Sequence, residues 1–175
     1  RKVASQWVLQ HVVPRARDFL LPTQLGVGVS GGSEAVLHTI QAHLHYEPAH
    51  ILLKLDLENA FNRVDRRLAK RILEERFPES LPLYVLGYGP DSANGSYHFG
   101  WLPEEGSPSS ARDRFFLRSR TGVQQGDPLA PVLHALALSP YLMAMRSLFP
   151  NITVLALHDD ISLAGPYYDI QEAFQ

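Results

Sequence analysis

The sequence predicts a mixed α+β fold, because stretches with a helical spacing of apolar residues are interrupted by short apolar runs of strand length. The segments follow the order helix–strand–helix, then a hairpin, then helix–strand–strand. This order differs from the regular strand–helix alternation of a parallel α/β sheet. The 175 residues suffice for one domain, and contents of 19% charged and 45% hydrophobic residues are typical of a globular chain.

Composition excludes several classes of protein. The chain has no cysteine, which excludes disulfides and thiolate zinc sites. No apolar run reaches the ~18–20 residues of a membrane span, and no secretory leader opens the chain. We therefore expect an intracellular protein without membrane contact, in the nucleus or the cytoplasm. The formal net charge of −2 gives no overall positive field, so nucleic acid would have to bind through local patches.

The first third of the chain predicts two helices and a strand. Residues 2–20 have helical spacing, and Pro14 is expected to disturb the end of that helix. After the glycine-rich stretch 26–32, Ser33 is expected to cap a second helix, whose apolar stripe is Val36, Leu37, Ile40 and Leu44. A buried strand at 50–57 would place on one face Ile51, Leu53, Leu55 and Leu57, and on the other Leu52, Lys54 and Asp56.

The rest of the chain predicts two further helices, a hairpin and two short strands. Asp65 can cap a helix that ends near Pro78, with the apolar stripe Leu68, Ala69, Ile72 and Leu73. The stretch 81–89 is ambiguous. Residues 96–102 and 112–120 alternate as the two strands of a hairpin, and 129–149 is a long apolar helix with an interruption at Pro140. Two short strands follow at 152–157 and 161–164.

Three acidic residues stand at strand ends. Asp56 lies among leucines, where an acid is costly unless it is paired or binds a metal ion. Asp159 and Asp160 are adjacent in a tight turn, so their negative charges repel each other. Taken alone, this pair is better explained by a solvated turn, since aspartate is common in turns. Together the three carboxylates suit a divalent ion, because Mg²⁺ prefers a few carboxylate oxygens plus substrate phosphates.

Three segments in this order resemble the motifs of reverse transcriptases. ILLKLDLENAFNRVD at 51–65 resembles motif A, TGVQQGDPLAPVL at 121–133 resembles motif B, and VLALHDDISLAG at 154–165 resembles motif C. Upstream, QLGVGVSGGSEAVLH at 24–38 resembles the segment that precedes the palm in non-LTR retrotransposon polymerases.

The resemblance covers nearly the whole chain and implies a right-hand polymerase palm, an antiparallel sheet with packed helices, plus part of the fingers. Residues 1–49 would form the fingers–palm junction and residues 50–175 the palm. The chain begins at Arg1 without methionine and stops at Gln175 in a helical pattern. We therefore expect a fragment that lacks the early fingers and the thumb.

The resemblance also implies the catalytic residues. Asp56 and Asp159 would hold two Mg²⁺ ions, or Mn²⁺, with the backbone carbonyl of Leu57. Asp160 would be the less directly coordinating neighbour. The implied activity is RNA-templated DNA synthesis, and its partners are an RNA template, a DNA primer and deoxynucleoside triphosphates.

Nucleotide contacts are implied for three further residues. Phe61 would pack under the incoming sugar and exclude a 2′-hydroxyl, whereas Gln125 and Gly126 would lie near the nascent base pair. One position departs from the family, because Leu157 stands where motif C usually has tyrosine or phenylalanine. Two alternatives follow: an inactive retroelement remnant that at most binds nucleic acid, and the palm of an RNA-dependent RNA polymerase, which Phe61 disfavours.

A basic strip is predicted on the second strand of the hairpin. Period-two alternation places on one face Arg112, Arg114, Phe116, Arg118 and Arg120. Arginine forks match phosphate oxygens, so the strip is a candidate nucleic-acid contact, and a solvated strand edge is the alternative. Basic residues at 63–76 are expected to form a solvated helix face, with nucleic-acid contact as an optional role. The glycine pattern at 26–31 does not suit a dinucleotide site, since Pro22 disfavours the strand that such a site needs.

Overall fold

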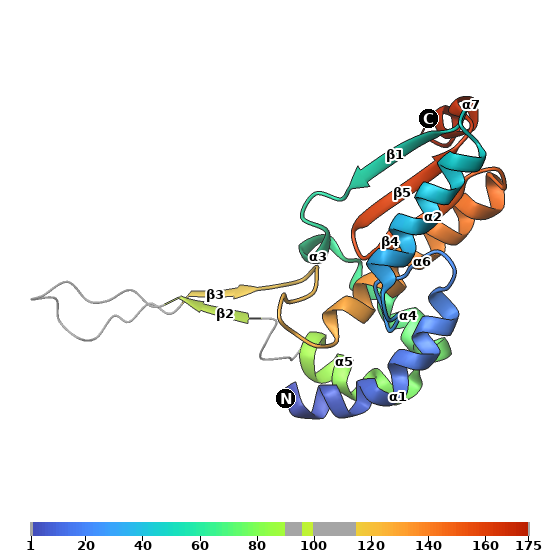
Figure 1. The fold of residues 1–175 in the computed structure, drawn as a ribbon. Helices are drawn as coiled ribbons and strands as arrows, with labels where there is room; N and C mark the ends of the chain where they lie inside the picture. Colours follow the sequence, from blue (N-terminus) through green and yellow to red (C-terminus); the bar gives the residue numbers. More distant parts are fainter. Residues whose placement is uncertain (1, 90–95, 100–114, 175) are drawn as a thin grey trace, which may run out of the picture.

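The computed structural model describes residues 2–89, 96–99 and 115–174 of the chain. Its elements are α1 (Lys2–Leu20), α2 (Gly32–Tyr46), β1 (Ile51–Asp56), α3 (Ala60–Arg63), α4 (Arg66–Arg76), the 3-10 turn η1 (Pro78–Ser80), α5 (Leu81–Tyr88), β2 (Ser96–Phe99), β3 (Phe115–Arg118), α6 (Ala130–Leu148), β4 (Thr153–Leu157), β5 (Asp160–Gly165) and α7 (Tyr167–Ala173). Figure 1 shows a small sheet among helices, which confirms the predicted α+β class.

Three strands form an antiparallel sheet in the order β1-β5-β4. β1 is an edge strand, so the prediction of a buried strand at 50–57 was wrong: Ile51 is 37% and Leu52 38% exposed. The predicted separation of its two faces is confirmed in part. Leu53, Leu55 and Leu57 pack into an apolar cluster, whereas Lys54 and Asp56 are exposed.

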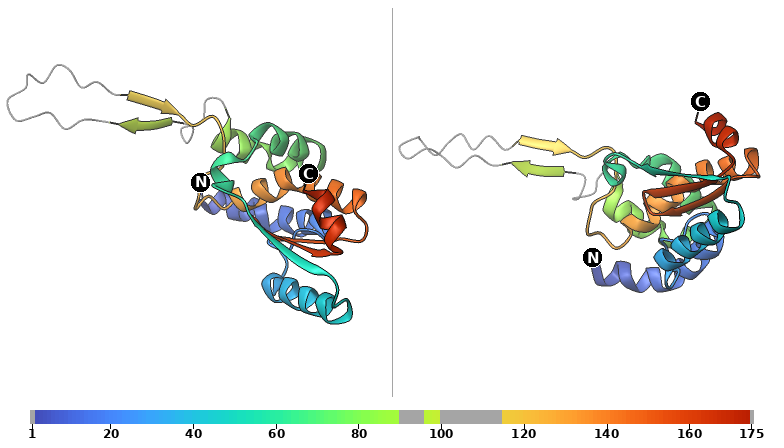
Figure 2. Two further views of the ribbon diagram at one scale, coloured as in Figure 1. Left: turned by 90° about the horizontal axis from the view of Figure 1, so that it is seen from above. Right: turned by 45° about the horizontal axis from the view of Figure 1, so that its top comes forward.

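Helices cover both faces of this sheet (Figure 2). On one face, Leu142 of α6 and Ile170 of α7 pack against strand residues that include Val154, Ile161 and Leu163. On the other face, Ile40 of α2 packs against Leu155 of β4 and Leu25. Because side chains alternate along a strand, Lys54 and Asp56 belong to the face on which α2 lies.

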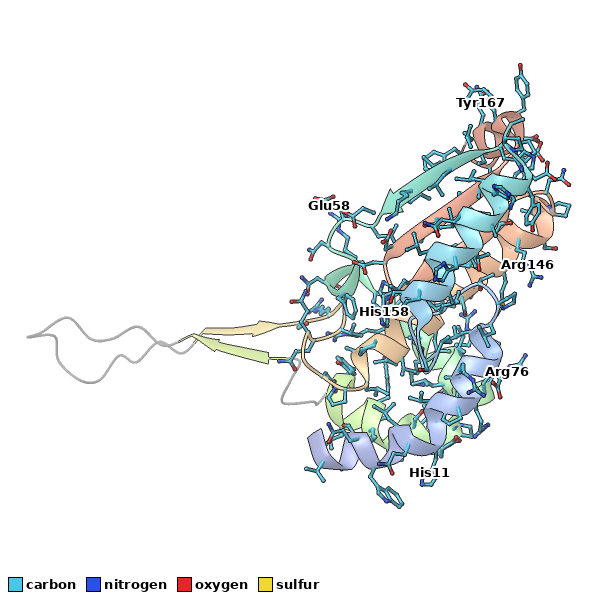
Figure 3. The ribbon with its side chains drawn as sticks, in the orientation of Figure 1. His11, Glu58, Arg76, Arg146, His158 and Tyr167 are labelled. Carbon is cyan, nitrogen blue, oxygen red and sulfur yellow. The ribbon has the colours of Figure 1, made fainter. Side chains whose placement is uncertain are left out.

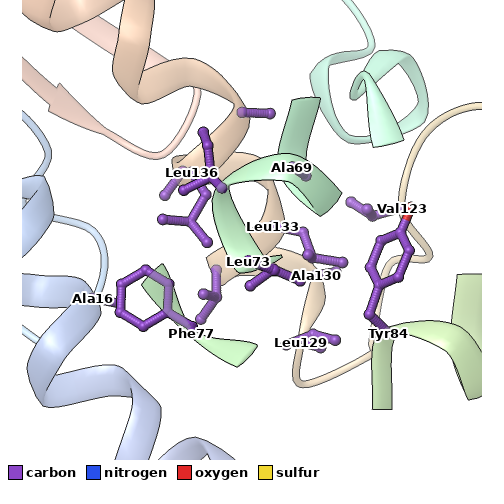
Figure 4. Close-up of a cluster of buried hydrophobic side chains, with 14 of the residues drawn as sticks. Ala16, Ala69, Leu73, Phe77, Tyr84, Val123, Leu129, Ala130, Leu133 and Leu136 are labelled. Carbon is purple, nitrogen blue, oxygen red and sulfur yellow. The ribbon is translucent and has the colours of Figure 1, made fainter. Parts of the chain in front are cut away.

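The largest core lies beside the sheet, between α1, α4, α5 and α6 (Figure 4). Leu73 of α4 and Leu133 and Leu136 of α6 are fully buried there. The predicted stripe of α4 is confirmed, and Asp65 caps the helix by accepting hydrogen bonds from the backbone N–H groups of Arg67 and Leu68. α6 contributes to both this core and the cluster under the sheet, which fixes the two parts to each other.

Both helices with an internal proline continue through it. α1 runs beyond Pro14 to Leu20, and α6 runs through Pro140 to Leu148, so the predicted disturbance and interruption were wrong. Proline at 140 removes the N–H that would bond the carbonyl of Leu136. The hydroxyl of Ser139 donates to that carbonyl instead, at 2.8 Å, which replaces the missing hydrogen bond.

Two predictions about α2 need correction. Gly31, in a left-handed conformation with φ 65°, is the N-cap, and Ser33 lies inside the helix with its hydroxyl bonded to the Glu34 carboxylate. Leu37 is 54% exposed because the sheet meets only the side of α2 that carries Ile40. The ambiguous stretch 81–89 forms helix α5.

β2 and β3 pair as a separate antiparallel hairpin, with Ser96 opposite Arg118 and Phe99 opposite Phe115. The outer parts of the two predicted strands, 100–102 and 112–114, lie outside the described residues. Within the residues that the structure describes, none of the helices combines the length and the hydropathy that crossing a membrane requires.

Candidate active site

Two of the predicted acidic residues lie opposite each other at one end of the sheet. Asp56 is the last residue of β1, and its Cα is paired with that of Asp160, the first residue of β5. Directly opposed residues of an antiparallel pair project from the same face. Lys54, two residues before Asp56 on that face, places Nζ 3.2 Å from Oδ2 of Asp160. A cation therefore already balances part of the negative charge.

Asp159 lies in the turn between β4 and β5. His158 and Asp159 make up this turn, and Asp160 already belongs to β5, so the strand begins one residue earlier than predicted. His158 has φ 57°, a left-handed conformation that residues with a side chain rarely adopt. Figure 3 labels His158 in this turn and Glu58 just beyond β1, at the same end of the sheet. The shared ion site of Asp56 and Asp159 stays a prediction.

A cluster of rings lies under the turn. Phe61, in α3, stacks on His134 of α6 with ring centroids 4.8 Å apart, and its ring is 6.4 Å from that of His158. Burial lowers the pKa of both histidines, and the negative charge of Asp159 opposes that effect. Asp159 thus lies in the electrostatic reach of both rings, although His134 comes from a helix that carries none of the predicted acids.

Phe61 itself is half-buried and packs against the main core. Its predicted contact with the sugar of a nucleotide stays a prediction, and its stacking on His134 shows a packing role as well. His134 is 4% exposed. Its Nδ1, like that of His158, is buried and has no hydrogen-bond partner among the described residues.

The loop in the segment that resembles motif B is hydrogen-bonded to the segment that resembles motif A. The N–H of Gly122 donates to the carbonyl of Val64 at 3.0 Å, and that of Val123 donates to the carbonyl of Phe61 at 2.6 Å. A Cβ on Gly122, which has φ +73°, would lie 2.2 Å from the carbonyl oxygen of Asn62. Only glycine permits this approach, and it draws the two motifs together.

Gln125 and Gly126 lie in the exposed part of this loop. Gly126 has φ +83°, and a Cβ there would meet no atom within 4 Å. A pocket of about 230 Å³ opens beside the loop between α3, α4 and α5, and its lining includes Asn62, Gln124 and Gln125. The contact of Gln125 and Gly126 with a base pair stays a prediction. The loop borders a pocket that Asn62 also lines.

Arg66 holds the same loop from the side of α4. Its guanidinium donates to the carbonyls of Gly122 and Ser119 and to the hydroxyl of Ser119. It also lies over the ring of Tyr88, whose hydroxyl bonds the carboxylate of Asp127. Arg66 therefore departs from the predicted solvated face at 63–76, because the loop folds back onto the start of the helix.

Half of the predicted basic strip lies outside the described residues. Arg112 and Arg114 fall outside the described residues, and Arg118 is placed only as the last residue of β3. Arg120 is exposed and follows the strand rather than belonging to it. The nucleic-acid contact of these four residues stays a prediction.

The metal site also stays a prediction. Among the residues described, no three histidine or acidic side chains converge as a group able to hold an ion by themselves. Mg²⁺ commonly uses one or two carboxylates and completes its shell with water and substrate phosphates. The opposed carboxylates of Asp56 and Asp160, with Asp159 next to them in the turn, are a donor set of that kind.

Sequence reasoning missed two residues that shape the site, Gln24 and His134. Gln24 is fully buried, and its side chain bonds the backbone of His158, 134 positions away. No local pattern indicates such a contact, although Gln24 opens the segment that resembles the one before the palm. His134 sits in an apolar helix, where only its polar character among apolar neighbours could have drawn attention.

The fold of this chain is similar to that of solved telomerase structures. No family model matches the sequence, and no curated protein matches it. Apo telomerase from Candida tropicalis, truncated from its C-terminal domain, aligns with a TM-score of 0.59 and 15% identity over 98% of this chain and 35% of that chain. Telomerase from Candida albicans, in complex with the TWJ fragment of telomeric RNA, aligns with a TM-score of 0.53 and 14% identity over 99% and 31%.

This chain therefore spans about a third of the length of each telomerase chain. At such identities the likeness concerns the fold alone. The described residues have a fold similar to part of telomerase.

Proposed function

We propose that the chain is the palm part of an RNA-directed DNA polymerase, which joins deoxynucleotides to a DNA primer on an RNA template. The observation that carries the proposal is the apposition of Asp56 and Asp160 at the end of the sheet. Motif B is hydrogen-bonded to motif A beside these acids. The likeness to part of telomerase supports a polymerase of this type.

Divalent ions are the cofactors that the donor set suits. Asp56, Asp159 and the backbone carbonyl of Leu57 would hold Mg²⁺, or Mn²⁺, with Asp160 as a neighbour already paired with Lys54. When bound, the ions would lower the pKa of the primer 3′-hydroxyl and neutralise the charge of the pyrophosphate. The sheet contributes rigidity, because both acidic segments are anchored by continuous strand pairing from Ile51 to Asp56.

Nucleotide selection is assigned to the region beside these acids. Phe61 stands five residues after Asp56 and would meet the sugar, which favours deoxynucleotides over ribonucleotides. Gln125 and Gly126, exposed next to the pocket of about 230 Å³, would contact the nascent base pair. We propose that the parent polymerase belongs to a non-LTR retrotransposon, because the three motifs and the segment 24–38 resemble those of such elements.

Primer extension tests the activity. The complete polypeptide that contains this chain would be supplied with an RNA template, a DNA primer and deoxynucleoside triphosphates in Mg²⁺. Asp56→Asn and Asp159→Asn should each abolish extension without lowering the melting temperature. Asp18→Asn, at an exposed aspartate of α1, is the matched control.

Three results would contradict parts of the proposal. Wild-type extension by Asp56→Asn or Asp159→Asn would refute the assigned acids. A preference for ribonucleotides would favour an RNA polymerase palm. Nucleic-acid binding without extension by the complete wild-type polypeptide would favour an inactive remnant. The sequence feature that favours this alternative is Leu157, which stands where motif C usually has an aromatic residue.

A further inference from the structure

A segment outside the three motifs reaches the aspartate turn. Residues 23–26 run beside β4, with Gln24 in a parallel bridge to Ala156. The N–H of Leu25 donates to the carbonyl of Ala156 at 2.8 Å, and the N–H of Ala156 donates to the carbonyl of Thr23 at 2.6 Å. These bonds fix the segment on β4 two residues before His158.

The side-chain amide of Gln24 holds His158 from both sides. Its Oε1 accepts from the N–H of His158 at 2.8 Å, and its Nε2 donates to the carbonyl of His158 at 3.0 Å. The same Oε1 accepts from the N–H of Gly26 at 2.9 Å. Gln24 is 0% exposed, so water does not compete for these bonds.

The residue held in this way has an unfavourable backbone conformation. His158 has φ 57°, which crowds the Cβ of any residue except glycine against its own backbone. Bonds to both its N–H and its carbonyl fix that conformation. Because His158 directly precedes Asp159, its dihedral angles determine the direction in which the Asp159 side chain leaves the turn.

Gly26 shows how closely the segment and the turn fit. A Cβ at Gly26 would lie 2.8 Å from the backbone nitrogen of His158 and 2.9 Å from its ring Cδ2. Neither contact is possible without displacing the turn. Gln24 and Gly26 thus act on the same residue, one by hydrogen bonds and the other by leaving space.

We infer that Gln24 is a positioning residue for the proposed metal site: it holds the turn at His158 so that Asp159 projects towards the end of β1, where Asp56 lies. The inference rests on the proposed function and assigns a role to a residue outside motifs A, B and C. Gln24 touches neither ion nor nucleotide and acts through the backbone of His158.

The test measures Mn²⁺ affinity of the 175-residue chain by electron paramagnetic resonance, together with a melting curve and the exchange rate of the His158 amide hydrogen. Gln24→Met keeps an unbranched chain of similar size and removes all three hydrogen bonds. Thr23→Val is the matched control, since Thr23 is 1% exposed and its hydroxyl donates to the carbonyl of Leu20.

In Gln24→Met we expect Mn²⁺ affinity to fall roughly fivefold to tenfold, because the two bonds that fix the backbone of His158 are lost. The His158 amide should exchange faster by a similar factor. Thr23→Val should melt earlier but keep both wild-type values. Wild-type Mn²⁺ affinity in folded Gln24→Met, or an equal loss in Thr23→Val, would overturn the inference.

Two further variants keep the test decisive. If Gln24→Met does not fold, Gln24→Glu retains the acceptor for both N–H groups but replaces the donor by a carboxylate oxygen that repels the His158 carbonyl, so a loss of affinity is again expected. Gly26→Ala should also weaken Mn²⁺ binding, because its Cβ would press on both His158 and Oε1 of Gln24. Unchanged affinity in both would overturn the inference.

Failure of the proposed function gives a different result. In that case the wild-type chain would bind no Mn²⁺ that depends on Asp56 or Asp159. The His158 amide would then decide the positioning role alone: faster exchange in Gln24→Met but not in Thr23→Val supports it, and equal exchange overturns it.

Discussion

Asp56 and Asp160 lie directly opposite each other at the end of β1 and the start of β5, although 103 other residues separate them in the sequence. Antiparallel pairing sets this register and gives both carboxylates the same face of the sheet. Lys54 shares that face and bonds Asp160 at 3.2 Å. The end of the sheet therefore gathers two negative charges and one positive charge before any ion or substrate arrives.

Lys54 should oppose cation binding. In Lys54→Met we expect Mn²⁺ affinity to rise roughly threefold, because an exposed ion pair is worth about 0.2–1 kcal/mol and its loss frees Asp160. Electron paramagnetic resonance of Mn²⁺ measures the change. Lys70→Met, which breaks an exposed pair with Glu74 in α4, is the control and should leave the affinity unaltered. Weaker Mn²⁺ binding in Lys54→Met would contradict this prediction.

Phe61 should control both sugar choice and stability. Phe61→Val in the complete polypeptide should raise ribonucleotide incorporation by orders of magnitude, because the ring no longer overlaps a 2′-hydroxyl, while deoxynucleotide addition falls modestly. The lost stacking on His134 should cost about 2 kcal/mol of unfolding free energy. Single-nucleotide extension with each sugar and a urea titration measure the two effects. Early unfolding with wild-type sugar preference would identify Phe61 as a packing residue only.

Replacing Gly122 by alanine should lower the unfolding free energy far more than replacing Gly126. Gly122→Ala forces a Cβ to 2.2 Å from the Asn62 carbonyl in addition to its strain at φ +73°, so we expect a loss of at least about 3 kcal/mol. Gly126→Ala has similar strain at φ +83° but open space, and should lose about 1 kcal/mol. Urea unfolding of both variants gives the comparison. Equal losses would contradict the predicted clash between a Cβ at position 122 and the Asn62 carbonyl.

Tyr84 should make the protein sensitive to alkali. Burial raises the pKa of its hydroxyl above the ordinary value of 10.0, so the unfolded state loses its proton first as the pH rises. Stability from this group is complete below pH 10 and declines above it. In Tyr84→Phe the unfolding free energy should be lower at pH 8, since the bond to the Arg66 carbonyl is lost, but should decline less above pH 10. Tyr168→Phe, at an exposed position, is the control, and parallel pH profiles for wild type and Tyr84→Phe would refute the prediction.

If the basic strip contacts phosphates, it should make nucleic-acid binding depend on salt concentration. Replacing Arg118 and Arg120 by glutamine should weaken nucleic-acid binding without sequence preference and reduce the salt slope by about 0.7–0.9 per lost phosphate contact. Fluorescence anisotropy with an RNA–DNA duplex at several salt concentrations measures the slope. The exposed pair Arg67 and Arg71 on α4 provides the control. An unchanged slope would return the strip to a solvated strand edge.

Local sequence patterns predicted helices and strands well where the deciding interaction lies within a few residues. Asp65 caps α4 as expected, because an aspartate oxygen before a helix meets free N–H groups with no need of distant partners. Ser33 was expected to do the same and does not, since the left-handed Gly31 begins α2 earlier. Pro140 was expected to interrupt α6, but the hydroxyl of Ser139 satisfies the carbonyl that proline leaves unbonded.

The sequence by itself determined the α+β class, the order of the main elements and the three acids at strand ends, because period, capping and charge act over a few residues. The tertiary structure alone decided which strand lies at the edge, which acid faces Asp56 and which buried side chains meet the turn. Strand register and the contacts of Gln24, Arg66 and His134 join residues far apart in the chain. Their energies depend on burial and on partners that exist only once the sheet, α4 and α6 have packed together.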